Sequence, residues 1–228
     1  GEPLIQFYGY KTCGVWNSAE EIAANPHFSD DAPGGIRIVD TNNDGSLTPE
    51  DRVALGTPYP DFTWGITNTF QIKDFDISFL IQGVQGITVL NGDVYYNETK
   101  KWNKKYTKNR WVSAEHPGDG KTPYQNVKTG HDLMLTDYPL QNASYACLRN
   151  FTVGYTLPAT AARKIKLSGV RFYVSGSNLL YIWGSGYKGI NPESRMTSGN
   201  YSSAMISGYQ RGGFPLTSTI SAGFDINF

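Results

Sequence analysis

Apolar and polar residues alternate without a break along the final segment, 217–228. Ile220, Phe224 and Phe228 fall on one side of an extended backbone, while Thr219 and Asp225 fall on the other. A side-chain period of two predicts a β-strand with one apolar and one polar face. A strand of about 11 residues is roughly twice as long as a usual globular strand, but it matches a tilted crossing of a lipid bilayer.

The same alternation recurs upstream and predicts further strands. In the segment 62–72, Phe62 and Ile66 oppose Thr63 and Thr67. A two-residue polar turn follows, which predicts a hairpin with the next strand. The alternation is weakest in the first segment. The predicted strands lie near 4–16, 62–72, 75–83, 145–157, 170–182 and 217–228.

Short and long connections alternate between these strands. The short ones are 73–74 and 158–168, and the long ones are 17–61, 86–144 and 183–215. All long connections would therefore leave the sheet at one end, which is typical of bacterial outer-membrane barrels. Structureless connections of this length are uncommon inside compact soluble domains.

The predicted fold class is an all-β, antiparallel transmembrane β-barrel segment with long extracellular loops, covering 1–228 as one domain. The polar faces carry Thr, Gly, Asn and Gln, which suit an aqueous lumen facing away from lipid. Six strands cannot enclose a lumen, so the remaining strands would have to come from elsewhere. The alternative is a soluble β-sandwich whose apolar faces form a core.

Composition narrows the possible functions. The 20 Lys+Arg balance 20 Asp+Glu, so no net positive charge attracts nucleic acid. Charged residues make up 18%, below the roughly 25% of a typical soluble domain. No apolar run is long enough for a membrane-spanning helix. Cys13 and Cys147 allow one disulfide bridge but do not require it.

Motifs for catalysis are lacking, and we expect a non-enzymatic chain. There is no GxSxG nucleophile elbow and no phosphate-binding loop. The Ser and His residues have no spaced partners for nucleophilic catalysis. Asp74 and Asp76 are interpreted as solvated turn residues instead of a glycosidase pair.

The segment 40–51 matches the EF-hand-like calcium loop. Its spacing places oxygen ligands where Ca²⁺ prefers them, and Gly45 supplies the sharp turn. The closing residue is Asp instead of the usual bidentate Glu. The alternative is an Asx-rich turn in which the side chains bond backbone amides without an ion. The candidate calcium ligands are Asp40, Asn42, Asp44, Ser46 and Asp51.

Several ordered sequence blocks, spread over nearly the whole chain, resemble the C-terminal part of the SusC/RagA family of TonB-dependent outer-membrane transporters of Bacteroidota. Among them are Pro33-Gly-Gly35 leading into Asp40-Thr-Asn-Asn-Asp-Gly45, Gly56-Thr-Pro58 with Pro60-Asp-Phe62, Gln82-Gly-Val-Gln-Gly86, Leu148-Arg-Asn-Phe151, Gly154-Tyr-Thr-Leu-Pro158, and Gly186-Tyr-Lys-Gly189.

The resemblance implies a 22-stranded barrel with an N-terminal plug, a TonB-contacting segment and a SusD-like surface lipoprotein as its lid, which imports oligosaccharides or oligopeptides. This chain would contribute about the last six strands, embedded in the bacterial outer membrane. The rest of the barrel, the plug and the TonB contact would lie in a part of the transporter that this sequence does not include. Phe228 resembles the aromatic end that the barrel-assembly machinery reads.

Aromatic residues of the long loops are the candidate contacts for the substrate or the lid. They are Trp102, Trp111 and Tyr187. They could stack on sugars or pack against the lipoprotein, or they could simply order the loops. The alternative function is a secreted, calcium-dependent, carbohydrate-binding β-sandwich, in which the same aromatic residues and the 40–51 loop would be the binding features.

Overall fold

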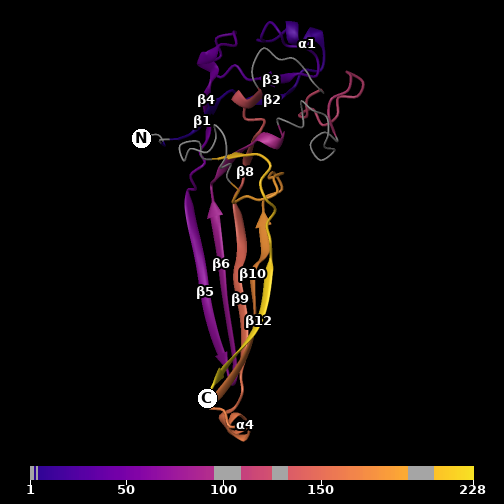
Figure 1. Ribbon diagram of the computed structural model, residues 1–228. Coiled ribbons are helices and arrows are strands. Elements are labelled where there is room, and N and C mark those ends of the chain that lie inside the picture. The colour runs from indigo at the N-terminus through magenta and orange to yellow at the C-terminus, as the bar shows by residue number, and fades with distance from the viewer. Residues whose placement is uncertain (1–2, 4, 95–108, 125–132, 195–207) are drawn as a thin grey trace. The chain divides into compact units, whose positions relative to one another are not determined.

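The computed structural model describes residues 3, 5–94, 109–124, 133–194 and 208–228 (Figure 1). It divides into two compact units. The loop unit comprises Gly1–Tyr59, Thr88–Asn142 and Glu193–Gly213, and the sheet unit comprises Pro60–Ile87, Ala143–Pro192 and Phe214–Phe228. In the described residues, no helix is long and apolar enough to cross a membrane.

The sheet unit is built on a five-stranded sheet in the order β12-β10-β9-β6-β5. Every neighbouring pair is antiparallel. The strands have 9 to 15 residues and run side by side along their length (Figure 1). They are β5 (Phe62–Ile72), β6 (Phe75–Gln85), β9 (Tyr145–Thr156), β10 (Gly169–Trp183) and β12 (Thr219–Asn227).

The register of the sheet places apolar residues from all five strands side by side on one face. Phe172 of β10 pairs with Tyr155 of β9 on one side and with Phe224 of β12 on the other. On β6, Ile77 lies between Phe70 of β5 and Val153 of β9. Since side chains alternate along each strand, the Thr, Ser, Gln and Asn residues between these positions share the opposite face.

Short connections join the strands at one end of the sheet. Lys73, in the left-handed conformation with φ 56°, turns β5 into β6. The helix α4 (Ala159–Lys164) lies between β9 and β10. Its C-cap is Ile165, and the next residue, Lys166, has φ 62°. Both Lys73 and Lys166 adopt a backbone that non-glycine residues visit mainly in turns.

The loop unit consists of short elements held by two-strand pairings. β1 (Phe7–Gly9) pairs with β4 (Val53–Gly56), and β2 (Thr12–Val15) pairs with β3 (Ile36–Ile38). A three-stranded sheet has the order β11-β7-β8. The strands of this sheet are β7 (Thr88–Asn91), β8 (Leu140–Asn142) and β11 (Tyr209–Gln210). The short helices of the loop unit are α1 (Ala19–Ala23), η1 (Pro49–Asp51) and η2 (Leu133–Leu135).

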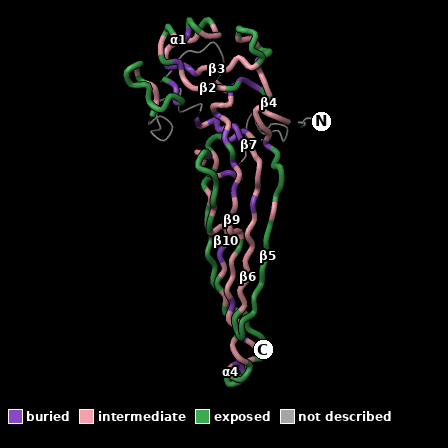
Figure 2. Tube along the Cα trace, turned by 180° about the vertical axis from the view of Figure 1, so that it is seen from behind, coloured by how far each residue is buried: buried purple, intermediate pink, exposed green. Residues whose placement is uncertain are grey.

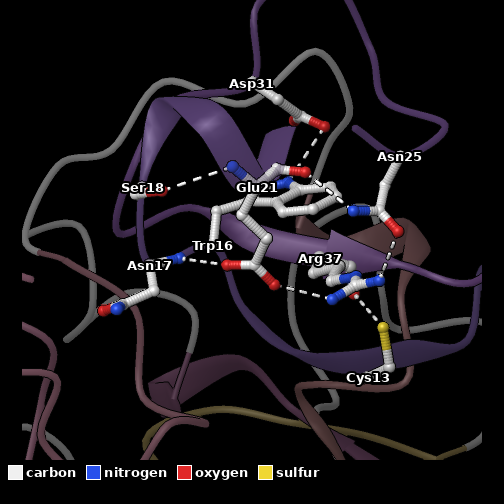
Figure 3. Close-up of polar contacts among 8 residues, drawn as sticks. All are labelled: Cys13, Trp16, Asn17, Ser18, Glu21, Asn25, Asp31 and Arg37. Carbon is white, nitrogen blue, oxygen red and sulfur yellow. Dashed lines mark hydrogen bonds and ion pairs between the residues drawn. The ribbon is translucent and has the colours of Figure 1, made fainter. Parts of the chain in front are cut away.

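A small core and a polar cluster stabilise the loop unit. Tyr10, Ile36 and Ile38 form the core. Helix α1 is linked to β3 because Arg37 donates to Glu21 at 2.7 Å (Figure 3). The Arg37 guanidinium also lies 4.8 Å from the ring centroid of Trp16, which is fully buried. These contacts replace the long backbone pairings that the short strands lack.

Five of the six predicted strands are confirmed, with ends within two residues of the prediction. The prediction of a strand near 4–16 is wrong, since that segment forms β1 and β2 of the loop unit. The backbone changes partners along it: β1 pairs with β4, Tyr10 donates to the carbonyl of Leu135, and β2 pairs with β3. Gly14, with φ 126°, lies at a register shift in the pairing of β2 with β3.

Candidate functional site: the two faces of the long sheet

The apolar face of the long sheet is exposed. Ile220, Phe224 and Phe228 are 74%, 65% and 93% exposed, and β5 is exposed along almost its whole length (Figure 2). A β-sandwich would bury these side chains in a core. In the described part of the sheet unit they have no such cover, so the β-sandwich alternative is wrong. Their exposure fits strands whose outer face meets lipid.

An ion-pair network crosses the polar face near the end that carries the short turns. Arg171 of β10 donates from Nε and Nη2 to the two carboxylate oxygens of Asp76 on β6, at 3.0 and 2.6 Å. Its Nη1 donates to Asp225 of β12 at 3.3 Å. This fork of two parallel bonds is the strong geometry for an arginine and a carboxylate. The interpretation of Asp76 as a solvated turn residue is therefore wrong.

Gly154 of β9 makes this network possible. It pairs with both Asp76 and Tyr173, so it lies between β6 and β10. A Cβ added there would clash with the Asp76 carboxylate and the Arg171 guanidinium. The glycine leaves room for the two side chains to meet across the intervening strand.

A second polar cluster surrounds Arg149 of β9. Its Nη1 donates to the side-chain oxygen of Asn178 and to the hydroxyl of Tyr181, each at 2.8 Å. With its amide oxygen turned toward Arg149, Gln82 accepts from Nε at 2.9 Å. The guanidinium also lies 5.7 Å from the ring centroid of Tyr181. The cluster therefore joins β6, β9 and β10 on the polar face.

The sequence analysis did not identify Arg149 as a residue of the polar face, because a β-bulge places it on that face. Leu80 pairs with Asn150, but the next residue of β6, Ile81, pairs with Leu148. Arg149 is thus the extra residue of β9, and simple alternation does not predict its direction. The only sequence signal was the interruption of the apolar pattern at Leu148-Arg149-Asn150.

A row of aromatic rings continues from this cluster toward the end of β10. Tyr145 and Tyr181 have centroids 6.0 Å apart, and Tyr181 and Trp183 are 6.4 Å apart. Trp183 then meets Tyr187 edge-on at 6.1 Å. Rings beside a guanidinium and amide groups can stack on apolar sugar faces and bind hydroxyl or carbonyl groups.

The predicted contact residues have different surroundings. Tyr187 is 4% exposed, which favours a role in ordering its loop. Trp111 lies in the loop unit, 5.9 Å from Tyr124, and donates from Nε1 to Asn17 at 3.0 Å. Trp102 lies outside the described residues. Their contact with a substrate or a lid stays a prediction.

Hydrogen bonds to backbone amides order the 40–51 loop. The carboxylate of Asp40 accepts from the amide of Gly45 at 2.8 Å, and Asn42 accepts from the amide of Asp44 at 2.9 Å. Asp44 in turn accepts from the amide of Ser46 at 2.8 Å. This is the geometry of the Asx-rich turn. Among the described residues, no group of three or more His, Cys, Asp or Glu side chains is arranged to hold a metal ion.

Asp51 closes this loop from a buried position. Its carboxylate accepts from the amides of Thr41 and Thr48, both at 2.8 Å, and forms a capping box at the start of η1. Burial raises the pKa of Asp51, but the hydrogen bonds from Thr48, Thr41 and Asn42 together outweigh it, and the net pKa is lowered. The carboxylate is therefore ionised and shared among amides. Calcium binding by the loop stays a prediction.

Cys13 and Cys147 do not form a disulfide bond with each other. Cys13 lies in the loop unit and Cys147 in the sheet unit. Burial raises the pKa of the Cys13 thiol, although the nearby Arg37 charge lowers it. The bridge that the sequence allowed is not formed.

Comparison with known proteins gives relatives over the whole chain. No protein-family model matches it. It is 31% identical over 238 residues to TonB-dependent receptor P26 of Formosa agariphila, covering 100% of the chain and 23% of that receptor. It is 27% identical over 157 residues to TonB-dependent receptor SusC of Bacteroides thetaiotaomicron, covering 68% of the chain and 15% of SusC.

A solved structure has the same fold. The RagAB peptide transporter matches with a TM-score of 0.69 and 19% identity, over 98% of this chain and 22% of that one. The likeness assigns the long strands to part of a β-barrel with the fold of that protein. The chain spans less than a quarter of the length of each of these relatives.

Proposed function

Because the chain belongs to the SusC/RagA family of TonB-dependent receptors, we propose that it forms part of the barrel wall of a nutrient importer. The chain is an outer-membrane segment, as its relatives are. These relatives are receptors and transporters, in agreement with the expectation that the chain is not an enzyme. In this proposal the apolar face meets lipid and the polar face lines the passage.

The exposed apolar face carries the proposal. Backbone groups in hydrocarbon must all be paired, since each unpaired group costs several kcal/mol. The long ladders meet this requirement inside the sheet, and only its two margins, at β5 and β12, need further partners. We infer that other strands of the same receptor pair with these margins and close the barrel.

The polar face supports a role in passage of a large polar solute. Arg149, the aromatic row and the Asp76–Arg171–Asp225 network provide hydrogen-bonding and stacking groups. Oligosaccharides and oligopeptides both present the hydroxyl, carbonyl and amide groups that such a face binds. The relative RagAB is a peptide transporter, so growth on glycans and on peptides by a strain lacking the receptor is the measurement that separates the two substrates.

The partners follow from the same family. We propose a SusD-like surface lipoprotein as the lid, a plug and further strands within the receptor, and TonB as the source of energy through the receptor's other parts. RagAB supports the lipoprotein as partner. Calcium in the 40–51 loop and recognition of Phe228 during assembly remain proposals that rest on the sequence.

Cysteine labelling tests which face meets lipid. In a Cys13→Ser background, Ile220→Cys and Ser221→Cys place a thiol at adjacent positions of β12 on opposite faces. In the full-length receptor in membranes, a water-soluble maleimide is expected to label position 221 and to spare position 220. A bromolipid that quenches a fluorophore attached at 220, but not at 221, would agree. Equal labelling of both positions from water would contradict the proposal.

A further inference from the structure

The connection between β9 and β10 is a cationic turn. Arg163, Lys164 and Lys166 are all exposed, and they surround Ile165, which is 57% exposed. The segment 157–170 contains no acidic residue. Arg163 and Lys164 stabilise the C-terminal end of α4 through the helix dipole, but this does not account for Lys166 or for the exposed isoleucine.

A groove lies on the apolar face next to this turn. Two rows of cross-strand neighbours from β9, β10 and β12 line it, with a volume of about 460 Å³, a size typical of small-molecule sites. The rows are Tyr155, Phe172, Phe224 and Val153, Val174, Ala222. Ala222 is the smallest of these side chains, so the surface is hollowed beside it.

The turn and the groove occupy the same end of the sheet unit. Leu157 donates to the carbonyl of Val170 and Ser168 donates to that of Asn227, each at 2.8 Å, so the ends of β9, β10 and β12 meet at the turn. Tyr155 and Phe172, which line the groove, each lie two residues from the hydrogen bond between Leu157 and Val170. Figure 1 shows α4 and the C-terminus at this end.

We propose that the groove and the turn together bind an anionic phospholipid. One acyl chain occupies the groove, and Lys164 and Lys166, with Arg163, bind the phosphate of the head group. Ile165 enters the interface between them. This inference rests on the proposed function, because it needs the apolar face in a bilayer with the short turns on the periplasmic side, where the inner leaflet supplies the lipid.

The first part of the test asks whether the lysines of the turn bind the lipid phosphate, and it compares two pairs of lysine substitutions. The full-length receptor in detergent is titrated with phosphatidylglycerol or phosphatidylcholine of identical acyl chains, and bound lipid is counted by native mass spectrometry. The Lys164→Gln/Lys166→Gln variant is expected to bind phosphatidylglycerol roughly 10- to 30-fold more weakly, from the contribution of each lysine near an anionic surface. Phosphatidylcholine binding is expected to stay unchanged. The control is Lys11→Gln/Lys121→Gln, which removes two exposed lysines of the loop unit.

The second part of the test uses substitutions in the groove to distinguish binding of a phospholipid from binding of free phosphate. Ala222→Phe fills the groove and is expected to reduce the retention of both lipids, while Ile220→Phe, on the same face but outside the lining, is expected to leave it unchanged. Millimolar inorganic phosphate is expected not to displace phosphatidylglycerol. Displacement by phosphate, together with no effect of Ala222→Phe, would assign the turn to phosphate alone and overturn the proposal.

The two proposals can fail separately. If Ile220→Cys is protected from water but the Lys164→Gln/Lys166→Gln variant binds phosphatidylglycerol as its control does, only the lipid site is wrong. If position 220 is labelled as readily as position 221, the bilayer-facing sheet and the lipid site are both wrong.

Discussion

The loop unit and the sheet unit place apolar residues in opposite surroundings. In the loop unit, Trp16, Ile36 and Ile38 are at most 3% exposed, and the strands of that unit have at most four residues. In the sheet unit, Ile220 and Phe224 are mostly exposed on strands of 9 residues or more. The loop unit therefore buries these residue types from water, whereas the sheet unit exposes them on the face that we propose meets lipid.

The means of stabilisation differ accordingly. Burying one large apolar side chain contributes about 1.5–3 kcal/mol in water, and the loop unit gains this from its small core. The sheet unit instead satisfies its backbone through long antiparallel ladders and ties its strands together with side-chain networks on the polar face. Substitutions in either unit therefore test this difference.

Truncation of the loop-unit core is expected to have the largest effect. Ile36→Ala removes buried methyl groups beside Tyr10 and should cost about 2–5 kcal/mol of local stability. Ile220→Ala, on the exposed apolar face, should cost far less. Hydrogen exchange of peptides from each unit of the full-length receptor measures both. Similar losses at the two positions would show that the exposed face is packed after all.

A charge in the middle of the apolar face is expected to have the next largest effect. Ile66→Lys should cost about 2–4 kcal/mol if position 66 lies near the bilayer centre. Thr67→Lys, at the adjacent position on the polar face, should cost little. Unfolding by urea in lipid vesicles, followed by heat-modifiable gel mobility, gives the two values. An equal cost would contradict the assignment of faces.

Overfilling the space at Gly154 is expected to cost less. Gly154→Ala should destabilise the receptor by about 1–3 kcal/mol, because the added methyl group displaces the Asp76–Arg171 pair. The cost should fall when Asp76→Ala and Arg171→Ala are already present, since the space is then free. Urea unfolding of the four combinations measures this coupling. Additive costs would mean that the ion pair does not depend on the glycine.

Acid should loosen the 40–51 loop by a smaller amount. The pKa of Asp51 is lowered in the folded state, so its stabilising effect is fully present above the unfolded value of about 3.9 and is lost as pH falls through the folded value. Hydrogen exchange at Thr41 and Thr48, corrected for intrinsic rates, should therefore accelerate in acid. Asp51→Asn should remove this dependence, whereas Glu50→Gln should keep it.

Calcium should have the smallest effect. The 40–51 loop is already ordered by amides, so an ion would bind in the millimolar range typical of extracellular modules. Calorimetric titration of the receptor should show heat that Asp44→Ala removes. The absence of any heat would leave the loop as an Asx-rich turn alone.

Local pattern predicted the long strands well and the short ones poorly. Five long strands follow from alternation within a single segment, which each strand carries in its own sequence. β3 and β4, three and four residues long, depend on partners elsewhere in the chain. For the same reason the segment 4–16 was predicted as one strand although its two halves pair with different neighbours.

The side-chain networks of the polar face could not be predicted from any single segment of the sequence. Asp76 and Arg171 are 95 positions apart, and only the register of β6, β9 and β10 brings them together. Arg149 was hidden by a bulge. The 40–51 loop differs from the polar face because its hydrogen bonds join residues close in sequence. The Asx-rich turn could therefore be predicted, as an alternative, from the sequence alone.

The arrangement around Gly154 constrains how related proteins can diverge. A lineage that keeps the carboxylate and the guanidinium cannot accept a side chain at that position without a fitness penalty, whereas one that first loses the charges can accept it freely. Once a larger residue is fixed there, restoring the charges becomes difficult in turn. Substitutions at these three positions would therefore have to occur in a particular order, and reversal would be obstructed by the history already accumulated.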